Sequence, residues 1–207
     1  MKLYLFLLIH LVFFAACNSQ ADQEKLIKDC FYNYKSAILN GDGKMAVEYV
    51  DSRTINYYDD MANKSVTSDS LALDSLSLVD KLMIVSIRFR TPNEQIKNFD
   101  GQSLFVYAVE SGMIGKNSLL KNGIGDIYID KDFAAAKFVA DGKVTSINYH
   151  FYKEESWKID LTEILPLGNS VMKKMLDKSG KSEYDFLFDL LETITGKRPS
   201  YNILNPI

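Results

Sequence analysis

The chain has 207 residues, of which 47% are hydrophobic and 25% are charged, a globular balance with enough length for one sizeable core. Its formal net charge is −3 at pH 7 and it has no block of lysines and arginines, which argues against a nucleic-acid partner. The twelve phenylalanines and twelve tyrosines supply bulky side chains for that core.

The amino-terminal segment has the pattern of a secretory signal peptide. Met1-Lys2 is a short positive start, residues 3–14 are nearly all apolar, and this run is too short for a comfortable membrane span. The small residues Ala15-Ala16 directly before Cys17 resemble the lipobox of bacterial lipoproteins, in which the cysteine is lipidated and becomes the first mature residue. Phe14 stands where that family usually has leucine. The alternative is an ordinary signal peptide cut before an incidental Cys17.

These observations predict a protein of the bacterial cell envelope, either periplasmic or surface-exposed. A lipid at Cys17 would attach it to a membrane. The expected organisation is a signal peptide at 1–16, the lipidated cysteine and a tether at 17–22, an α+β domain at 23–165 and a helical extension at 166–207.

Helical spacing of apolar residues comes first in the domain, over residues 23–40. Cys30 lies on this apolar stripe, and we expect a buried core thiol there rather than a nucleophile. A short helix is expected over 44–50. The tyrosines of residues 54–60 favour a short strand.

More helices are expected on either side of a central sheet. Before it, the pattern predicts helices over about 71–90, 93–98 and 103–110. After it, the pattern predicts helices over 169–178 and 182–195. Gly180 and Gly196 are expected to end these last two helices in the left-handed conformation.

Residues 124–165 predict the sheet itself. Lys131-Asp132, Asp141-Gly142 and Glu154-Glu155-Ser156 are turn sequences that divide this stretch into apolar-rich runs. A four-stranded antiparallel meander is the simplest arrangement of these runs.

The turn lengths also predict a register, because side chains alternate between the two faces of a strand. The expected apolar pairs are Ile129 with Ala134, Ile127 with Ala136, Ala136 with Ile147, Ala134 with Tyr149, Tyr149 with Leu161 and Phe151 with Ile159. The expected pairs on the opposite face are Asp126 with Lys137, Tyr152 with Lys158 and His150 with Asp160. The apolar face requires a cover.

Few residues have the chemistry of a catalytic site. His150 and Asp160 are of catalytic type, but this register favours a cross-strand surface pair over a catalytic dyad. Asp60 and Tyr57 are further acid–base candidates, although exposed loop carboxylates are much commoner. The sequence has no metal-ligand spacing and indicates no cofactor.

The order of these elements resembles the nuclear transport factor 2-like superfamily. The local features that carry the resemblance are Ala37-Ile38-Leu39-Asn40-Gly41-Asp42 and Glu155-Ser156-Trp157-Lys158-Ile159. The resemblance implies a cone-like α+β fold, with helices packed on a curved antiparallel sheet whose apolar face lines the core and any pocket. The pocket candidates are then Ala134, Ala136, Ile147, Tyr149 and Leu161. Tight packing of the alanines under a helix is the alternative.

Three functions remain open from the sequence. The first is a non-catalytic envelope lipoprotein that binds a small apolar ligand or a partner protein. The second, implied by the isomerases, cyclases and dehydratases of the superfamily, is an enzyme using Asp60, Tyr57 or His150. The third is an assembly role with the carboxy-terminal helices as the docking element. A cavity with an acid beside a tyrosine would favour the enzyme, a carboxylate-free cavity would favour binding, and a filled core with an exposed apolar patch would favour docking.

Overall fold

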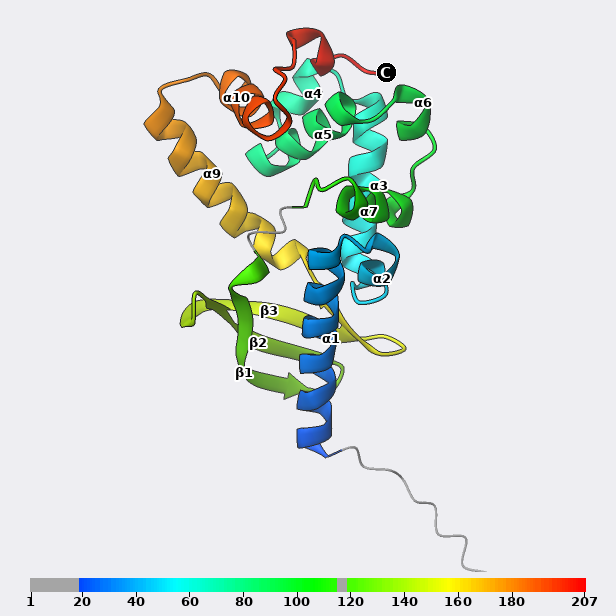
Figure 1. Cartoon of the computed structure of the whole chain (residues 1–207), viewed down its shortest axis with the longest axis vertical. Coiled ribbons are helices and arrows are strands. Elements are labelled where there is room, and N and C mark those ends of the chain that lie inside the picture. The colour runs from blue at the N-terminus through cyan, green and yellow to red at the C-terminus, as the bar shows by residue number, and fades with distance from the viewer. Residues whose placement is uncertain (1–18, 115–118) are drawn as a thin grey trace, which may run out of the picture.

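The computed structural model describes residues 19–114 and 119–207. This part of the chain is α+β, with amino-terminal helices, a four-stranded antiparallel sheet and carboxy-terminal helices (Figure 1). The predicted α+β class, with helices before and after a four-stranded antiparallel sheet, is therefore confirmed, but the sheet is not strongly curled. The predicted signal peptide at 1–16 and Cys17 lie outside the described residues. No helix in the described ranges combines the length and the hydropathy needed to cross a membrane.

The elements follow one another in three groups. The helices before the sheet are α1 (Gln20–Asn40), α2 (Gly43–Val47), α3 (Ser52–Thr67), α4 (Ser70–Asp74), α5 (Leu78–Arg90), α6 (Asn93–Ile96) and α7 (Gly101–Glu110). The strands are β1 (Asn122–Asp130), β2 (Phe133–Ala140), β3 (Lys143–Lys153) and β4 (Trp157–Asp160). The sheet is followed by η1 (Thr162–Ile164), α9 (Leu165–Ser179), α10 (Glu183–Thr195) and η2 (Tyr201–Leu204).

Short polar side chains define where most helices begin. Each of these residues accepts a hydrogen bond from a backbone N–H of the first helical turn, a group that has no partner inside the helix. They are Ser19, Asp42, Asp51, Asp69, Ser77, Asp100 and Ser182. At the other end, Gly180 and Gly196 take the left-handed conformation and end α9 and α10, as predicted.

Two predictions about the amino-terminal half are wrong. Residues 54–60 belong to helix α3 and not to a strand, because the Asp51 carboxylate accepts from the Thr54 N–H at 2.9 Å and starts a helix there. The expected single helix over 71–90 is two helices, α4 and α5. Ser77 accepts from the Asp80 N–H and begins α5 as a separate element.

The sheet confirms the predicted register at both of its outer pairings. Between β1 and β2, Ile127 pairs with Ala136 and Ile129 pairs with Ala134. Between β3 and β4 the observed pairs are His150 with Asp160, Phe151 with Ile159 and Tyr152 with Lys158, which requires the predicted three-residue turn at 154–156.

The predicted register between β2 and β3 is wrong. Ala134 pairs with Phe151 and Ala136 pairs with Tyr149, because the ladder shifts between Lys137 and Val139 and takes up two extra residues of β3. The Thr145 hydroxyl holds this bulge, since it donates to the Phe138 carbonyl at 2.9 Å and accepts from the Ile147 N–H at 3.2 Å. A shift of two residues keeps each side chain on its expected face.

Two other expected pairs do not form in the ladder. A shift in β1 between Ile124 and Ile127 takes Asp126 out of register with Lys137. Strand β4 ends at Asp160, so Leu161 has no partner in the sheet.

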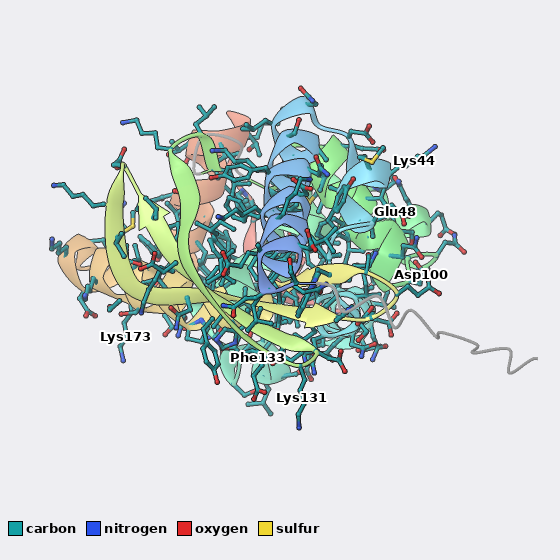
Figure 2. The ribbon with its side chains drawn as sticks, turned by 90° about the horizontal axis from the view of Figure 1, so that it is seen from below. Lys44, Glu48, Asp100, Lys131, Phe133 and Lys173 are labelled. Carbon is teal, nitrogen blue, oxygen red and sulfur yellow. The ribbon has the colours of Figure 1, made fainter. Side chains whose placement is uncertain are left out.

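Helix α1 covers the apolar face of the sheet (Figure 1). The Phe31 ring of α1 lies 5.3 Å from the Tyr149 ring of β3, and Ala134 and Ala136 are fully buried. In the view from below, α1 lies on one side of the sheet, and the labelled Phe133 lies toward the other (Figure 2). Cys30 is buried in α1, as predicted.

The carboxy-terminal helices pack back onto α5. Lys81 of α5 is almost fully buried and pairs with Glu183 of α10. The Arg88 guanidinium donates to the carbonyls of Ser65, Ser68 and Ile203 at 2.8, 2.6 and 3.1 Å. One arginine thus joins α3, α5 and the carboxy-terminal segment.

Candidate functional site

A cavity of about 410 Å³ lies among the helices rather than within the strands of the sheet. It is bounded by α1, α3, α5, α7, the segment after α7, η1 and its flanks, and α10. The described lining residues are Tyr34, Thr54, Tyr57, Tyr58, Val79, Leu82, Met83, Ser86, Ile87, Arg90, Leu104, Ala108, Gly112, Met113, Ile114, Leu161, Thr162, Ile164, Leu165, Leu191 and Ile194. No aspartate, glutamate, lysine or histidine occurs in this described lining.

Helix α5 forms one long wall of the cavity. Its lining residues recur at each helical turn. The wall begins at Val79, continues through Leu82, Met83 and Ser86, and ends at Arg90 in the last turn. At ~1.5 Å of rise per residue, the wall from Val79 to Arg90 is about 16 Å long. The cavity therefore extends along about 16 Å of α5, from Val79 to the cationic Arg90.

Tyr57 lines the cavity and was predicted as a candidate acid or base. Its hydroxyl donates to Asp80 Oδ1 at 2.8 Å, and the Ser77 hydroxyl donates to the other oxygen, Oδ2, at 2.8 Å. Burial, followed by the Asp80 carboxylate, raises the pKa of Tyr57 above its ordinary value. The phenol is thus held neutral, and both oxygens of its acidic neighbour already accept hydrogen bonds.

Two other polar side chains of the lining are also engaged within the protein. The Thr54 hydroxyl oxygen accepts from the Leu161 N–H at 2.9 Å. The Thr162 hydroxyl donates to Asp160 Oδ1 at 2.6 Å. These contacts hold η1 against α3 and leave little free hydrogen-bonding capacity on that wall.

The polar end of the α5 wall differs from the rest. Arg90 Nη2 donates to the Ser111 carbonyl at 2.6 Å, and this is the guanidinium's one hydrogen bond within the described ranges. No carboxylate forms an ion pair with Arg90 there. Gly112, the next residue after Ser111, is exposed, so this end of the cavity lies close to the surface.

The pocket candidates predicted from the sheet lie mostly outside the cavity lining. Of the five pocket candidates, Leu161 lines the cavity. Ala134, Ala136 and Tyr149 are buried beneath α1, the arrangement given above as the alternative. Ile147 is half-buried beside the bulge of β3.

The other acid–base candidates lie away from the cavity lining. Asp60 pairs with Lys64, one turn later on α3. His150 lies on the outer face, where its Nδ1 is 3.5 Å from Glu163 Oε2 and its ring is 5.2 Å from that of Phe133.

The predicted surface pair of His150 with Asp160 forms through the backbone and not through the side chains. Asp160 is 1% exposed and accepts from the Thr162 N–H and hydroxyl at 2.8 and 2.6 Å. The chain turns directly after β4, and this turn places the N–H and hydroxyl of Thr162 within hydrogen-bonding distance of the Asp160 carboxylate. His150 and Asp160 are therefore not brought together as a dyad.

The sequence analysis missed the main wall of the cavity. Ser86 and Arg90, which line the cavity from α5, were not among the predicted site residues. The described residues contain no cluster of histidine, cysteine, aspartate and glutamate that could hold a metal ion.

Comparison with protein-family models, with curated proteins and with solved structures finds no match for this chain.

Proposed function

We propose that this protein is a non-catalytic binding protein of the bacterial cell envelope that holds a small apolar ligand in the cavity beside α5. The observation that carries the proposal is the cavity itself, about 410 Å³ in volume with a lining of mainly aliphatic and aromatic side chains. This volume falls within the roughly 300–1,000 Å³ of ligand pockets. A ligand that removes such a lining from water gains about 25 cal/mol per Å² of apolar surface.

The chemistry of the lining favours binding over catalysis. An acid–base enzyme requires a titrating group in contact with its substrate. Tyr57 has a raised pKa, and the carboxylate beside it already accepts two hydrogen bonds. Asp60 and His150 are not among the residues lining the cavity. The proposal therefore assigns no catalytic residue.

The resemblance to the nuclear transport factor 2-like superfamily remains part of the proposal. The order of helices followed by an antiparallel meander supports it. The weak curl of the sheet and the burial of Ala134 and Ala136 under α1 weigh against a cone whose sheet lines the pocket. The proposed binding site accordingly lies among the helices.

The membrane anchor is proposed from the sequence around Cys17. Helix α1 begins at Gln20, so a lipid on Cys17 would have a very short tether. The proposed protein thus holds the start of α1 close to a membrane, with the cavity in the helices beyond the sheet.

An assembly role stays a prediction. Part of the carboxy-terminal segment packs against α5, but α9 leaves Leu167, Val171 and Met175 exposed by 38%, 48% and 47%. These residues, spaced four apart on one face of the helix, are the surface that such a role would use.

The experiment that tests the proposed function is native mass spectrometry of the protein purified from its own envelope. The expected result is a non-covalent adduct of small-molecule mass. Protein that consistently carries no such mass would contradict the proposal.

A further inference from the structure

At the polar end of the cavity, Arg90 has no carboxylate paired with it within the described residues. Arg90 is half-buried beside an apolar cavity, a position in which a guanidinium gains from a charge-assisted bond to an anion. Arg90 donates to the Ser111 carbonyl, which uses one of its several N–H donors. Within the described ranges, no ion pair involves Arg90, and no carboxylate lines the cavity. The remaining donors are therefore suited to an anion supplied by a ligand.

Ser86 adds a second polar group at the same end. It lies one helical turn before Arg90 on the same face of α5, and both residues line the cavity. Serines and threonines in helices commonly donate to the carbonyl four residues earlier, as Ser65 and Thr67 do in α3 at 2.7 and 3.0 Å. Ser86 makes no such bond within the described residues, which leaves its hydroxyl for the cavity.

The opposite end of the same wall is mainly apolar, and the Tyr57 hydroxyl there is already bound to Asp80, the residue after Val79. Val79, Leu82 and Met83 line it from α5, and Leu165 and Leu191 line it from the carboxy-terminal helices. With about 16 Å between Val79 and Arg90, the wall of α5 is long enough for an extended chain with one polar end.

We propose that the ligand is a single-chain apolar carboxylic acid, whose carboxylate binds Arg90 and Ser86 and whose chain follows α5 toward Val79. This rests on the proposed function, because it names the ligand class of the same cavity. A planar guanidinium binds a carboxylate through two parallel hydrogen bonds. A carboxylate also matches the charge of one arginine, whereas a phosphate monoester brings nearly two negative charges.

The test is calorimetric titration of the whole mature protein with dodecanoic acid and with dodecan-1-ol, which has the same chain and no charge. The unaltered protein is expected to bind the acid about tenfold more tightly or better, the effect of a charge-assisted hydrogen bond. Arg90→Gln is expected to abolish this preference and to leave binding of the alcohol unchanged. The matched control is Arg198→Gln, which removes the arginine that follows α10 and pairs with Asp185 and Asp189 on it. This variant is expected to keep the preference for the acid.

Met83→Trp separates this inference from the proposed function, because the larger side chain obstructs the cavity midway along α5. If the acid and the alcohol bind equally and Met83→Trp abolishes both, the carboxylate assignment is overturned and the binding function stands. If neither compound binds the unaltered protein, both proposals are overturned for single-chain apolar ligands. The comparison of acid with alcohol uses the unaltered protein, so it decides the matter even if Arg90→Gln fails to fold.

Discussion

At the scale of the residue, buried polar groups decide local structure more than apolar ones do. Asp51 is fully buried, caps α3 through Thr54 and pairs with Arg53 at 3.0 Å. Its cap converts a tyrosine-rich stretch, which has strand propensity, into a helix. That helix then presents Thr54, Tyr57 and Tyr58 to the cavity.

Asp51→Ala is therefore expected to destabilise the protein by about 1–3 kcal/mol, through the lost cap and an unpaired buried N–H. Urea unfolding followed by circular dichroism measures the change. Asp69→Ala, at the exposed cap of α4, is the control and is expected to cost less. Equal losses in the two variants would contradict the importance given to the buried cap.

Cys30 gives a prediction for alkaline pH. Burial raises the pKa of its thiol from an ordinary 9.0 to about 12. A raised folded pKa means that the stabilisation is complete below pH 9.0 and is lost as the pH rises toward 12. The free energy of unfolding is expected to fall more steeply across this range in the unaltered protein than in Cys30→Ala. Parallel pH profiles for the two proteins would show that the thiol is not protected by burial.

At the scale of the element, turn chemistry predicted most of the sheet. Asp141-Gly142 and the three-residue turn at 154–156 place the ends of the strands correctly. The predicted register of β2 with β3 was wrong because of a bulge that the Thr145 side chain stabilises. Turn length and the alternation of side chains give no sign of such a contact. The split between α4 and α5 was missed for a similar reason, because a serine cap started a new helix inside an apolar pattern.

Thr145→Val is expected to destabilise the sheet by about 1 kcal/mol, because valine keeps the shape but removes both hydrogen bonds of the bulge. Thermal unfolding of the variant measures the loss. Thr193→Val removes one exposed hydrogen bond of α10 and should have a smaller effect. An unchanged midpoint for Thr145→Val would mean that the backbone alone sets the register.

At the scale of the whole molecule, the cavity arises from helices distant in the sequence. Its lining extends from Tyr34 to Ile194, and of the predicted candidates only Tyr57 and Leu161 belong to it. Sequence patterns identify the apolar stripe of each helix. They do not identify which part of a stripe stays uncovered after the helices pack. Ala134 and Ala136, predicted as pocket candidates, are packed under α1, which occupies that space with Phe31 and its neighbours.

The proposed lipid anchor at Cys17 gives a prediction for the protein in its cell. Cys17→Ser is expected to release the protein from the membrane fraction or to leave its precursor unprocessed. Fractionation followed by mass measurement of the amino-terminal peptide tests this. Unchanged processing together with unchanged membrane association would rule out lipidation at Cys17.

The central claim is that the cavity beside α5 holds a small apolar ligand. Native mass spectrometry of the unaltered protein, Met83→Trp and Met175→Trp, each purified from the envelope, tests it most directly. Both substitutions introduce the same side chain, but Met83 lines the cavity and Met175 lies exposed on α9. The account predicts a ligand mass on the unaltered protein and on Met175→Trp, and none on Met83→Trp. A ligand mass retained by a folded Met83→Trp, or absent from all three proteins, would contradict it.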